Sequence, residues 1–212
     1  MNQVKRYFQE VKAKRVVEAL KKRGFDARYV DSFAEAKEEV ISMLPEGATI
    51  ALGGSVTLQE MGLLDEVKKD KYNYIDRYAP VPWEETLDRY RQGLLADILL
   101  TSTNAITENG ELVNVDCSGN RLAGMIFGPK KVIVVAGVNK IVKDIDAALK
   151  RLKEVAPMNC RRIGHDTPCR ETGVCVDCLS PARMCNAIGI ICADVKFGGR
   201  TTVIIVPEVG GY

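Results

Sequence analysis

The cysteines of this chain crowd into one segment, and they are its clearest chemical signal. Six of the seven lie between residues 160 and 192. Four of them follow the spacing C-x5-C-x2-C-x6-C, formed by Cys169, Cys175, Cys178 and Cys185. Thiolates two residues apart converge on one side of a turn, and four thiolates complete a tetrahedral zinc site or hold an iron–sulfur cluster. We therefore predict a metal centre on these four cysteines, a 4Fe-4S cluster with zinc as the alternative.

The same segment allows other interpretations. The cysteines could be free buried thiols, or Cys175 and Cys178 could form a reversible disulfide. His165 is the only histidine of the chain, which excludes a metal site built on two or three histidines. A serine–histidine–aspartate triad would have to use this residue, and the chain has no G-x-S-x-G elbow. Nearby arginines could offset the charge of thiolates: Arg161, Arg162, Arg170 and Arg183.

A strongly polar run occupies residues 101–121, directly after a buried apolar segment. Asn104 and Glu108 stand where the chain leaves the predicted strand, and we expect them to orient a substrate or exchange a proton with it. Arg121 offers a guanidinium for a carboxylate or phosphate, and Asn120 beside it offers an amide. The run therefore predicts a small-anion site with Asn104 and Glu108 as candidate catalytic residues.

A hairpin is the alternative interpretation of part of this run. The pair Asn109-Gly110 favours a tight turn between two antiparallel strands. A hairpin there would use the neighbouring polar groups for its own hydrogen bonds. It would still leave room for a binding site at its flanks.

The turn Gly53-Gly54-Ser55 is a third signal, between the apolar strand predicted over 49–52 and a predicted helix. Glycines let the backbone approach a ligand closely, and the first turn of a helix offers unpaired N–H groups. In open α/β sheets, ligands bind at the carboxyl ends of strands. We predict that Gly53, Gly54 and Ser55 bind an anion. The pattern is neither a Walker loop nor G-x-G-x-x-G, and a plain strand-to-helix turn would look the same.

Hydrophobic periodicity assigns the elements that must position these groups. We predict helices over 2–23, 32–44, 57–69, 83–92, 120–127 and 145–155, with a break at Gly62 in the third of them. We predict strands over 27–30, 49–52, 72–76, 97–102, 111–115, 131–136 and 201–206. Their alternation predicts a single α/β domain over residues 1–212, with a Rossmann-like, mostly parallel sheet covered by helices on both faces. The cysteine-rich segment 157–200 breaks the pattern, and we expect an irregular insertion before the last strand.

Composition narrows the class of protein. The 212 residues are 46% hydrophobic and 27% charged, with a net charge of +2. These values argue against disorder and against a strong electrostatic attraction to nucleic acid. No apolar stretch has the length of a membrane span, and the N-terminus lacks the apolar core of a signal peptide. We expect a cytoplasmic protein with reduced cysteines, and no nucleic-acid or membrane partner.

Three stretches together resemble the LUD-domain family, the domain shared by lactate-utilisation proteins. They are Gly53-Gly54-Ser55-Val-Thr-Leu, then Thr103-Asn104-Ala-Ile-Thr-Glu108-Asn-Gly110 with Gly119-Asn120-Arg121, and the cysteine run from Thr167-Pro-Cys169 to Cys185-Asn186. The resemblance covers nearly the whole chain. It implies a sheet like that of ribose-5-phosphate isomerase, glucosamine-6-phosphate deaminase and CoA transferases, with a cleft at the strand ends.

The resemblance also implies a function. Family members take part in oxidising L-lactate to pyruvate, beside partner proteins that carry iron–sulfur clusters. It carries over a presumed ligand site, made of Gly53, Gly54, Ser55, Asn104, Glu108, Asn120 and Arg121. This chain lacks the ferredoxin-type CxxCxxCxxxCP motifs of those partners. Electron transfer by the chain itself would therefore depend on its own cysteine set.

Three hypotheses follow, and the sequence leaves open whether the chain is an enzyme. In the first, a lactate-utilisation component binds a small carboxylate or phosphorylated ligand, works beside iron–sulfur lactate-oxidation partners and forms a homo-oligomer. In the second, a sugar-phosphate isomerase or CoA-transferase-like enzyme uses Glu108 or Asp116 as a base, which rests on analogy of fold. In the third, a non-enzymatic regulatory or scaffold protein depends on metal in the cysteine-rich segment.

Overall fold

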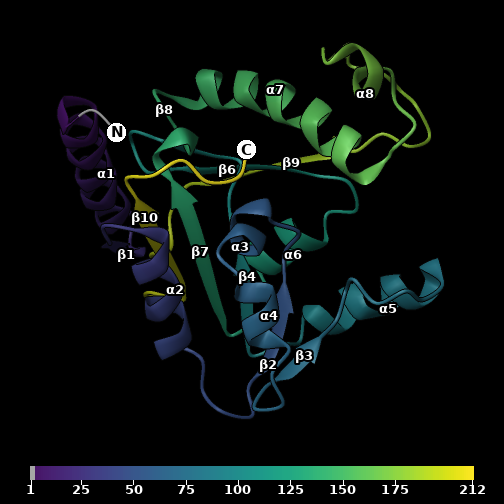
Figure 1. Ribbon diagram of the computed structural model, residues 1–212, viewed down its shortest axis with the longest axis horizontal. Coiled ribbons are helices and arrows are strands. Elements are labelled where there is room, and N and C mark those ends of the chain that lie inside the picture. Colours follow the sequence, from purple (N-terminus) through teal and green to yellow (C-terminus); the bar gives the residue numbers. More distant parts are fainter. Residues whose placement is uncertain (1–2) are drawn as a thin grey trace.

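A six-stranded parallel sheet forms the centre of the computed structural model, which describes residues 3–212 (Figure 1). Its strand order is β1-β10-β7-β4-β2-β3, and every neighbouring pair is parallel. The strands are β1 (Asp26–Tyr29), β10 (Thr201–Val206), β7 (Lys131–Gly137), β4 (Ile98–Thr101), β2 (Thr49–Leu52) and β3 (Asn73–Ile75). The predicted α/β class with a parallel sheet is confirmed.

Helices cover both faces of this sheet because its central strands are apolar on both sides. Val134 of β7 and Val203 of β10 belong to one core cluster, and their chain neighbours Ile133 and Ile204 belong to the other. Such alternation follows from the two-residue period of a strand. The first cluster includes side chains of α1 (Gln3–Lys22) and α6 (Asn120–Ile126). The second includes side chains of α2 (Phe33–Ser42), α3 (Val56–Glu60) and α4 (Leu63–Val67).

One glycine interrupts a predicted helix. The sequence predicts a helix over 57–69 with a break at Gly62, and the structure has α3 and α4 with Gly62 between them. Gly62 has a φ of +67°, a left-handed conformation that ends the first helix. The helix α5 (Trp83–Gly93) follows β3 and lies at that edge of the sheet (Figure 1). Within residues 3–212, no helix is long and apolar enough to span a membrane.

A second, four-stranded sheet stands beyond the carboxyl end of β7 (Figure 1). Its order is β8 (Ile141–Val142), β5 (Ala105–Thr107), β6 (Leu112–Asp116) and β9 (Ala187–Ile191). The strands β5 and β6 form the hairpin predicted at Asn109-Gly110. Gly110 closes its turn with a φ of +90° and donates a hydrogen bond to the Thr107 carbonyl at 2.9 Å. The helix α7 (Ile145–Ile163) packs on this sheet through Ala148 and Leu152.

The segment 157–200 is more ordered than predicted. The helix α7 continues through Pro157 to Ile163, because Cys160 stays buried on its inner face. A short helix, α8 (Pro168–Thr172), follows, and β9 pairs with β6. The insertion predicted before the last strand is present, but it is less irregular than expected. The predicted helix ended at residue 155, and β9 is only half-buried, so its apolar residues gave no clear strand signal.

Candidate functional site

The carboxyl ends of four neighbouring strands bring polar groups to one edge of the central sheet. Arg77 follows β3, Gly54 follows β2, Asn104 follows β4 and Lys140 follows β7. Because these strands are parallel and adjacent, their ends meet at the same edge. A cleft of about 470 Å³ lies there, with a chamber of about 30 Å³ beside it. Both are lined by Gly54, Asn104, Arg121 and Asn159.

The backbone after β2 forms part of the cleft floor. A Cβ on Gly53 would lie 2.4 Å from Oγ1 of Thr101, so only glycine fits at this position. The N–H of Gly54 donates to no acceptor in residues 3–212. Ser55 caps α3 by accepting a hydrogen bond from the N–H of Leu58 at 3.2 Å. Since α3 has five residues, we attribute anion affinity to individual groups here and not to a helix dipole.

Arg77 places an unpaired guanidinium over this floor. Its Nη2 lies 3.6 Å from the position of a Cβ on Gly54. It donates hydrogen bonds to the Leu52 carbonyl at 3.2 Å and to the Tyr90 hydroxyl at 3.0 Å, and it stacks on the rings of Tyr78 and Tyr90. No carboxylate of residues 3–212 forms an ion pair with it. Its charge is therefore held in place without being neutralised.

Arg121 lies in the cleft wall, and the protein itself takes most of its donors. Its Nε donates to Asp116 at 2.8 Å, and its Nη2 donates to Oδ1 of Asn104 at 2.7 Å and to the Val115 carbonyl at 2.8 Å. A longer contact of 3.5 Å joins Nη1 to the Ser102 carbonyl. One N–H of the five on a guanidinium is left free. Arg121 therefore fixes the position of Asn104 more than it offers charge to a ligand.

Asn104 keeps both N–H donors of its side-chain amide free at the junction of cleft and chamber. Its Oδ1 accepts from Arg121 and from the N–H of Val115 at 3.0 Å. Its backbone carbonyl accepts a hydrogen bond from Nε of Arg151 at 2.9 Å. Its Nδ2 donates to no acceptor in the described chain. An amide whose oxygen is fixed in this way presents its NH₂ group to a ligand.

Glu108 does not join Asn104. The strand β5 separates the two residues and carries Glu108 to the surface beside α1. Its Oε2 accepts a hydrogen bond from Nη2 of Arg15 at 2.6 Å, and its N–H donates to the Val142 carbonyl at 2.8 Å. Asn120, by contrast, lines the cleft at the start of α6.

Lys140 is a buried lysine that the sequence analysis did not single out. The residue is 3% exposed, and its Nζ donates to Thr57 Oγ1 and Ser102 Oγ, each at 2.9 Å. Burial first, then the positive charges of Arg151 and Arg121, lower the pKa of Lys140 to about 7. The residue lines the small chamber. An amine in this state can act as a base or a nucleophile.

The far end of α7 closes the outer side of the cleft. Arg162 donates a hydrogen bond to Oδ1 of Asn159 at 3.0 Å, and no carboxylate of the described chain pairs with it. His165 lies 2.8 Å through Nδ1 from the carbonyl of Ala182. Because a carbonyl only accepts, Nδ1 carries the proton in this contact, and Nε2 is the nitrogen left for other partners.

The balance of charge in the cleft favours an anion. Among the described residues, the only carboxylate side chain that lines the cleft or chamber is Asp116. Its two oxygens accept from Arg121 and from the N–H of Leu122 at 2.8 Å. Guanidinium groups exceed it in number: Arg77, Arg121 and Arg162. Fixed positive charge in a concave site attracts small anions.

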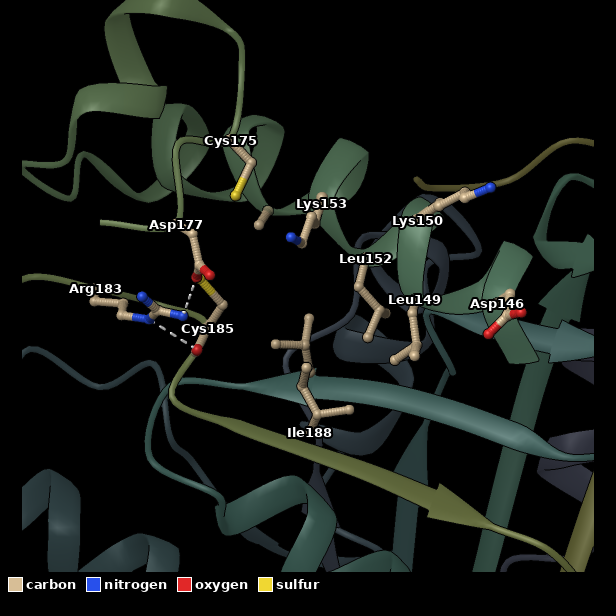
Figure 2. A pocket seen from close by; sticks show the side chains of 12 residues that line it. Asp146, Leu149, Lys150, Leu152, Lys153, Cys175, Asp177, Arg183, Cys185 and Ile188 are labelled. Atoms are coloured by element: carbon tan, nitrogen blue, oxygen red, sulfur yellow. Dashed lines mark hydrogen bonds and ion pairs between the residues drawn. The ribbon is translucent and has the colours of Figure 1, made fainter. Parts of the chain in front are cut away.

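The predicted metal ligands lie in a second region, between α7, α8 and β9. Cys175 and Cys185 line a largely apolar pocket of about 470 Å³, and Figure 2 shows both at one end of it. Cys169 is buried beside Cys160, and burial raises the pKa of Cys160 to about 11. Within residues 3–212, no three His, Cys, Asp or Glu side chains are grouped so that they could hold a metal ion. The four-cysteine centre, which includes Cys178, does not fit this arrangement and stays a prediction.

One arginine holds the cysteine loop together. Arg183 donates to the Cys185 carbonyl at 3.0 Å, to the Cys178 carbonyl, and to Oδ1 of Asp177 at 2.7 Å (Figure 2). Asp177 adopts a φ of +50°, which turns the chain between the two cysteines of the C-x2-C pair. The hydrogen bond to Arg183 lowers the pKa of Asp177. The guanidinium thus pairs with a carboxylate and with backbone, in contrast to Arg77.

Comparison with known proteins identifies the family. A family model described as LUD domain matches residues 13–206. The chain belongs to the LUD-domain family. Its fold is similar to a crystal structure of a DUF162 family protein from Deinococcus radiodurans, with a TM-score of 0.53 and 13% identity over 93% of this chain and 97% of that one. A partial similarity, to eIF2B delta from Chaetomium thermophilum, has a TM-score of 0.35 and 21% identity over 55% of this chain and 51% of that one. The search of curated proteins gave no match.

The predicted residues of this LUD domain divide into two groups. Those brought together at the strand-end cleft are Gly53, Gly54, Ser55, Asn104, Asn120 and Arg121. Glu108 and the cysteines lie elsewhere. Arg77 and Lys140 were missed, since Arg77 stands in a turn and Lys140 ends a short 3-10 helix, η1 (Val138–Lys140), neither with a recognisable motif. The available signal was position: both follow predicted strands of a parallel sheet.

Proposed function

We propose that this LUD-domain protein is a lactate-utilisation component that binds a small 2-hydroxy or 2-oxo carboxylate in the strand-end cleft. The unpaired guanidinium of Arg77 over the backbone of Gly54 is the observation that carries this proposal. A planar guanidinium recognises a carboxylate by two parallel hydrogen bonds. The free N–H of Gly54 supplies a further donor at the same place.

Each remaining group has a part in the proposal. The Nδ2 of Asn104 donates to the oxygen on C2 of the bound acid, while Arg121 holds the amide in position. Glu108 contributes nothing to the cleft, since it pairs with Arg15. Oxidation of a 2-hydroxy acid to a 2-oxo acid removes two electrons and two protons. In this proposal, an iron–sulfur partner protein accepts the electrons, and this chain binds and orients the acid.

The isomerase and CoA-transferase alternatives receive less support. Both need a free carboxylate as base or nucleophile beside the substrate. Asp116 is already committed to Arg121 and to the N–H of Leu122, and Glu108 lies outside the cleft. A cationic cleft without a free carboxylate suits binding of a small acid better than abstraction of a sugar proton.

Calorimetric titration tests the proposal. The wild-type protein is titrated with pyruvate, L-lactate and ribose 5-phosphate, and so are the variants Arg77→Gln and Arg91→Gln. Loss of a charge-assisted pair weakens binding by roughly 1.5–3 kcal/mol, which is about tenfold to a hundredfold in Kd. We expect that loss for Arg77→Gln only. Arg91 is the matched control, since it lies on the exposed side of α5 and pairs with Asp88. Equal affinity of both variants, or a clear preference for the sugar phosphate, would contradict the proposal.

A further inference from the structure

The hydrogen bonds of Lys140 fix the direction in which its amine is open. Thr57 Oγ1 donates to the Gly210 carbonyl at 3.2 Å, and Ser102 Oγ lies 3.5 Å from the Thr103 carbonyl as its donor. Each hydroxyl hydrogen points to a carbonyl, so each hydroxyl oxygen accepts from Lys140. Two N–H bonds of Nζ are thereby used. The remaining tetrahedral position has no partner in residues 3–212.

That remaining position distinguishes the two charge states of the amine. A neutral amine has two N–H bonds, which both hydroxyls satisfy, and one lone pair at the open position. An ammonium would place there a third N–H with no acceptor, in a buried site. Arg121 and Arg151 face the amine with like charge. The negative charge of Glu60 raises the pKa of Lys140, but Oε2 of Glu60 already accepts a hydrogen bond from the N–H of Gly211 at 2.8 Å. The contacts therefore match the neutral form.

Lys140 lines a space of suitable chemistry. Lys140, Gly54 and Asn104 line the same chamber of about 30 Å³, which adjoins the cleft. A carboxylate at Gly54 and Arg77 would leave the next carbon of the acid near the chamber. In a 2-oxo acid that carbon is an electrophilic carbonyl. A neutral lysine amine is a nucleophile for such carbonyls.

We propose that Lys140 forms a reversible imine with the C2 carbonyl of a 2-oxo acid bound in the cleft. The position of the carboxylate rests on the proposed function above; the reactive amine rests on the contacts of Lys140. The lone pair of Nζ forms the C–N bond as the carbonyl electron pair moves to oxygen, which takes up one of the two amine hydrogens as a proton. The two amine hydrogens and that oxygen leave as water. The step needs no oxidant or reductant, and Nδ2 of Asn104 is placed to donate to the oxygen.

Reductive trapping tests this step. The wild-type protein is incubated with pyruvate and cyanoborohydride, which reduces an imine to a stable secondary amine. We expect one added pyruvate per chain by intact mass, located on Lys140 by peptide mapping. Lys140→Met should lose the adduct. Lys143→Met, which removes an exposed lysine three residues away, should keep it.

The outcomes separate this inference from the proposed function. Pyruvate bound in calorimetry without an adduct on Lys140 overturns the imine and leaves the binding proposal standing. Adducts spread over surface lysines, or retained at the same yield in Lys140→Met, also overturn it. Absence of both binding and adduct in the wild-type protein overturns both proposals. Circular dichroism of each variant checks that a lost adduct does not reflect unfolding.

Discussion

The strand-end cleft and the loop over residues 175–185, called the cysteine-rich loop below, differ in how their arginines are paired. The cleft collects Arg77, Gly54, Asn104 and Lys140 from the ends of four neighbouring strands, and no carboxylate of the described residues pairs with Arg77 or Arg162. The cysteines and charged residues of the loop come from one short stretch of the chain, and its central cation, Arg183, pairs with Asp177 at 2.7 Å. The charge of the cleft is therefore unbalanced, whereas the central arginine of the loop is neutralised by a carboxylate.

This difference separates a binding site from a structural motif in physical terms. Unpaired charge and a buried amine reduce the stability of a fold, so they persist where a ligand uses them. A loop closed by its own hydrogen bonds needs no ligand to explain its charges. We therefore place ligand chemistry in the cleft, and we expect changes there to have the larger effects.

Two aspartate substitutions give the sharpest test of this comparison. Both carboxylates lie 2.7 Å from an arginine, but the side chains of Arg121 and Asp116 are 10% and 7% exposed, against 20% and 66% for Arg183 and Asp177. Asp116→Ala leaves a buried charge unpaired, and we expect it to lower the free energy of unfolding by about 3–5 kcal/mol. Asp177→Ala should lower it by less than about 1 kcal/mol. Urea unfolding measures both, and equal losses would remove the distinction between the regions.

The pH dependence of stability tests the buried amine. The folded-state pKa of Lys140 is about 7, below its ordinary value of 10.5. Between these values the unfolded chain binds more protons, so the contribution of this residue to stability rises with pH from about 7 to 10.5. Below pH 7 the full cost of burying the charge applies. Each unit of pKa corresponds to about 1.4 kcal/mol, so the total effect is on the order of a few kcal/mol.

Lys140→Met provides the comparison for that measurement. The methionine cannot titrate, so the difference in unfolding free energy between the wild type and the variant should shift in favour of the wild type as pH rises from 7 to 10. Lys143→Met is the control and should follow the wild type. A difference that is independent of pH would show that the amine keeps its ordinary pKa.

Metal analysis tests the loop. If the protein holds the predicted 4Fe-4S cluster, it should be brown with broad absorbance after anaerobic purification. The predicted ligands are Cys169, Cys175, Cys178 and Cys185. If it holds zinc instead, the protein should be colourless and contain one zinc ion per chain. Cys178→Ser should release either metal and change the affinity for pyruvate by less than about twofold, since the loop and cleft are separate regions. Metal-free wild-type protein contradicts the prediction, and a loss of pyruvate binding contradicts the separation.

Sequence patterns predicted the sheet better than the site. The strands at 49–52 and 131–136 are short apolar runs between clear helices, and burial on both faces makes such runs continuous. The second sheet was only partly predicted, because β9 is half-buried and pairs with a distant strand. Pro157 lies inside α7 and is buried together with nearby residues of that helix. Long-range packing decided these elements, and local propensity could not indicate it.

The site shows the same limit. Gly54 and Asn104 were grouped through the family resemblance, and they meet because the parallel strands before them end at one edge. Glu108 was grouped with them, but the three residues of β5 carry it to the other surface. Arg77 and Lys140 look like solvent-exposed residues in the sequence. Only the positions of β3 and β7 in the sheet bring them to the cleft.

A crystal structure of the wild-type protein with pyruvate tests the central claim most directly. We predict that the carboxylate of pyruvate lies within hydrogen-bond distance of the Arg77 guanidinium and the N–H of Gly54, with C2 directed toward Lys140. Pyruvate bound instead in the pocket beside Cys175 and Cys185, or a strand-end cleft that stays free of it at saturating concentration, would contradict the account.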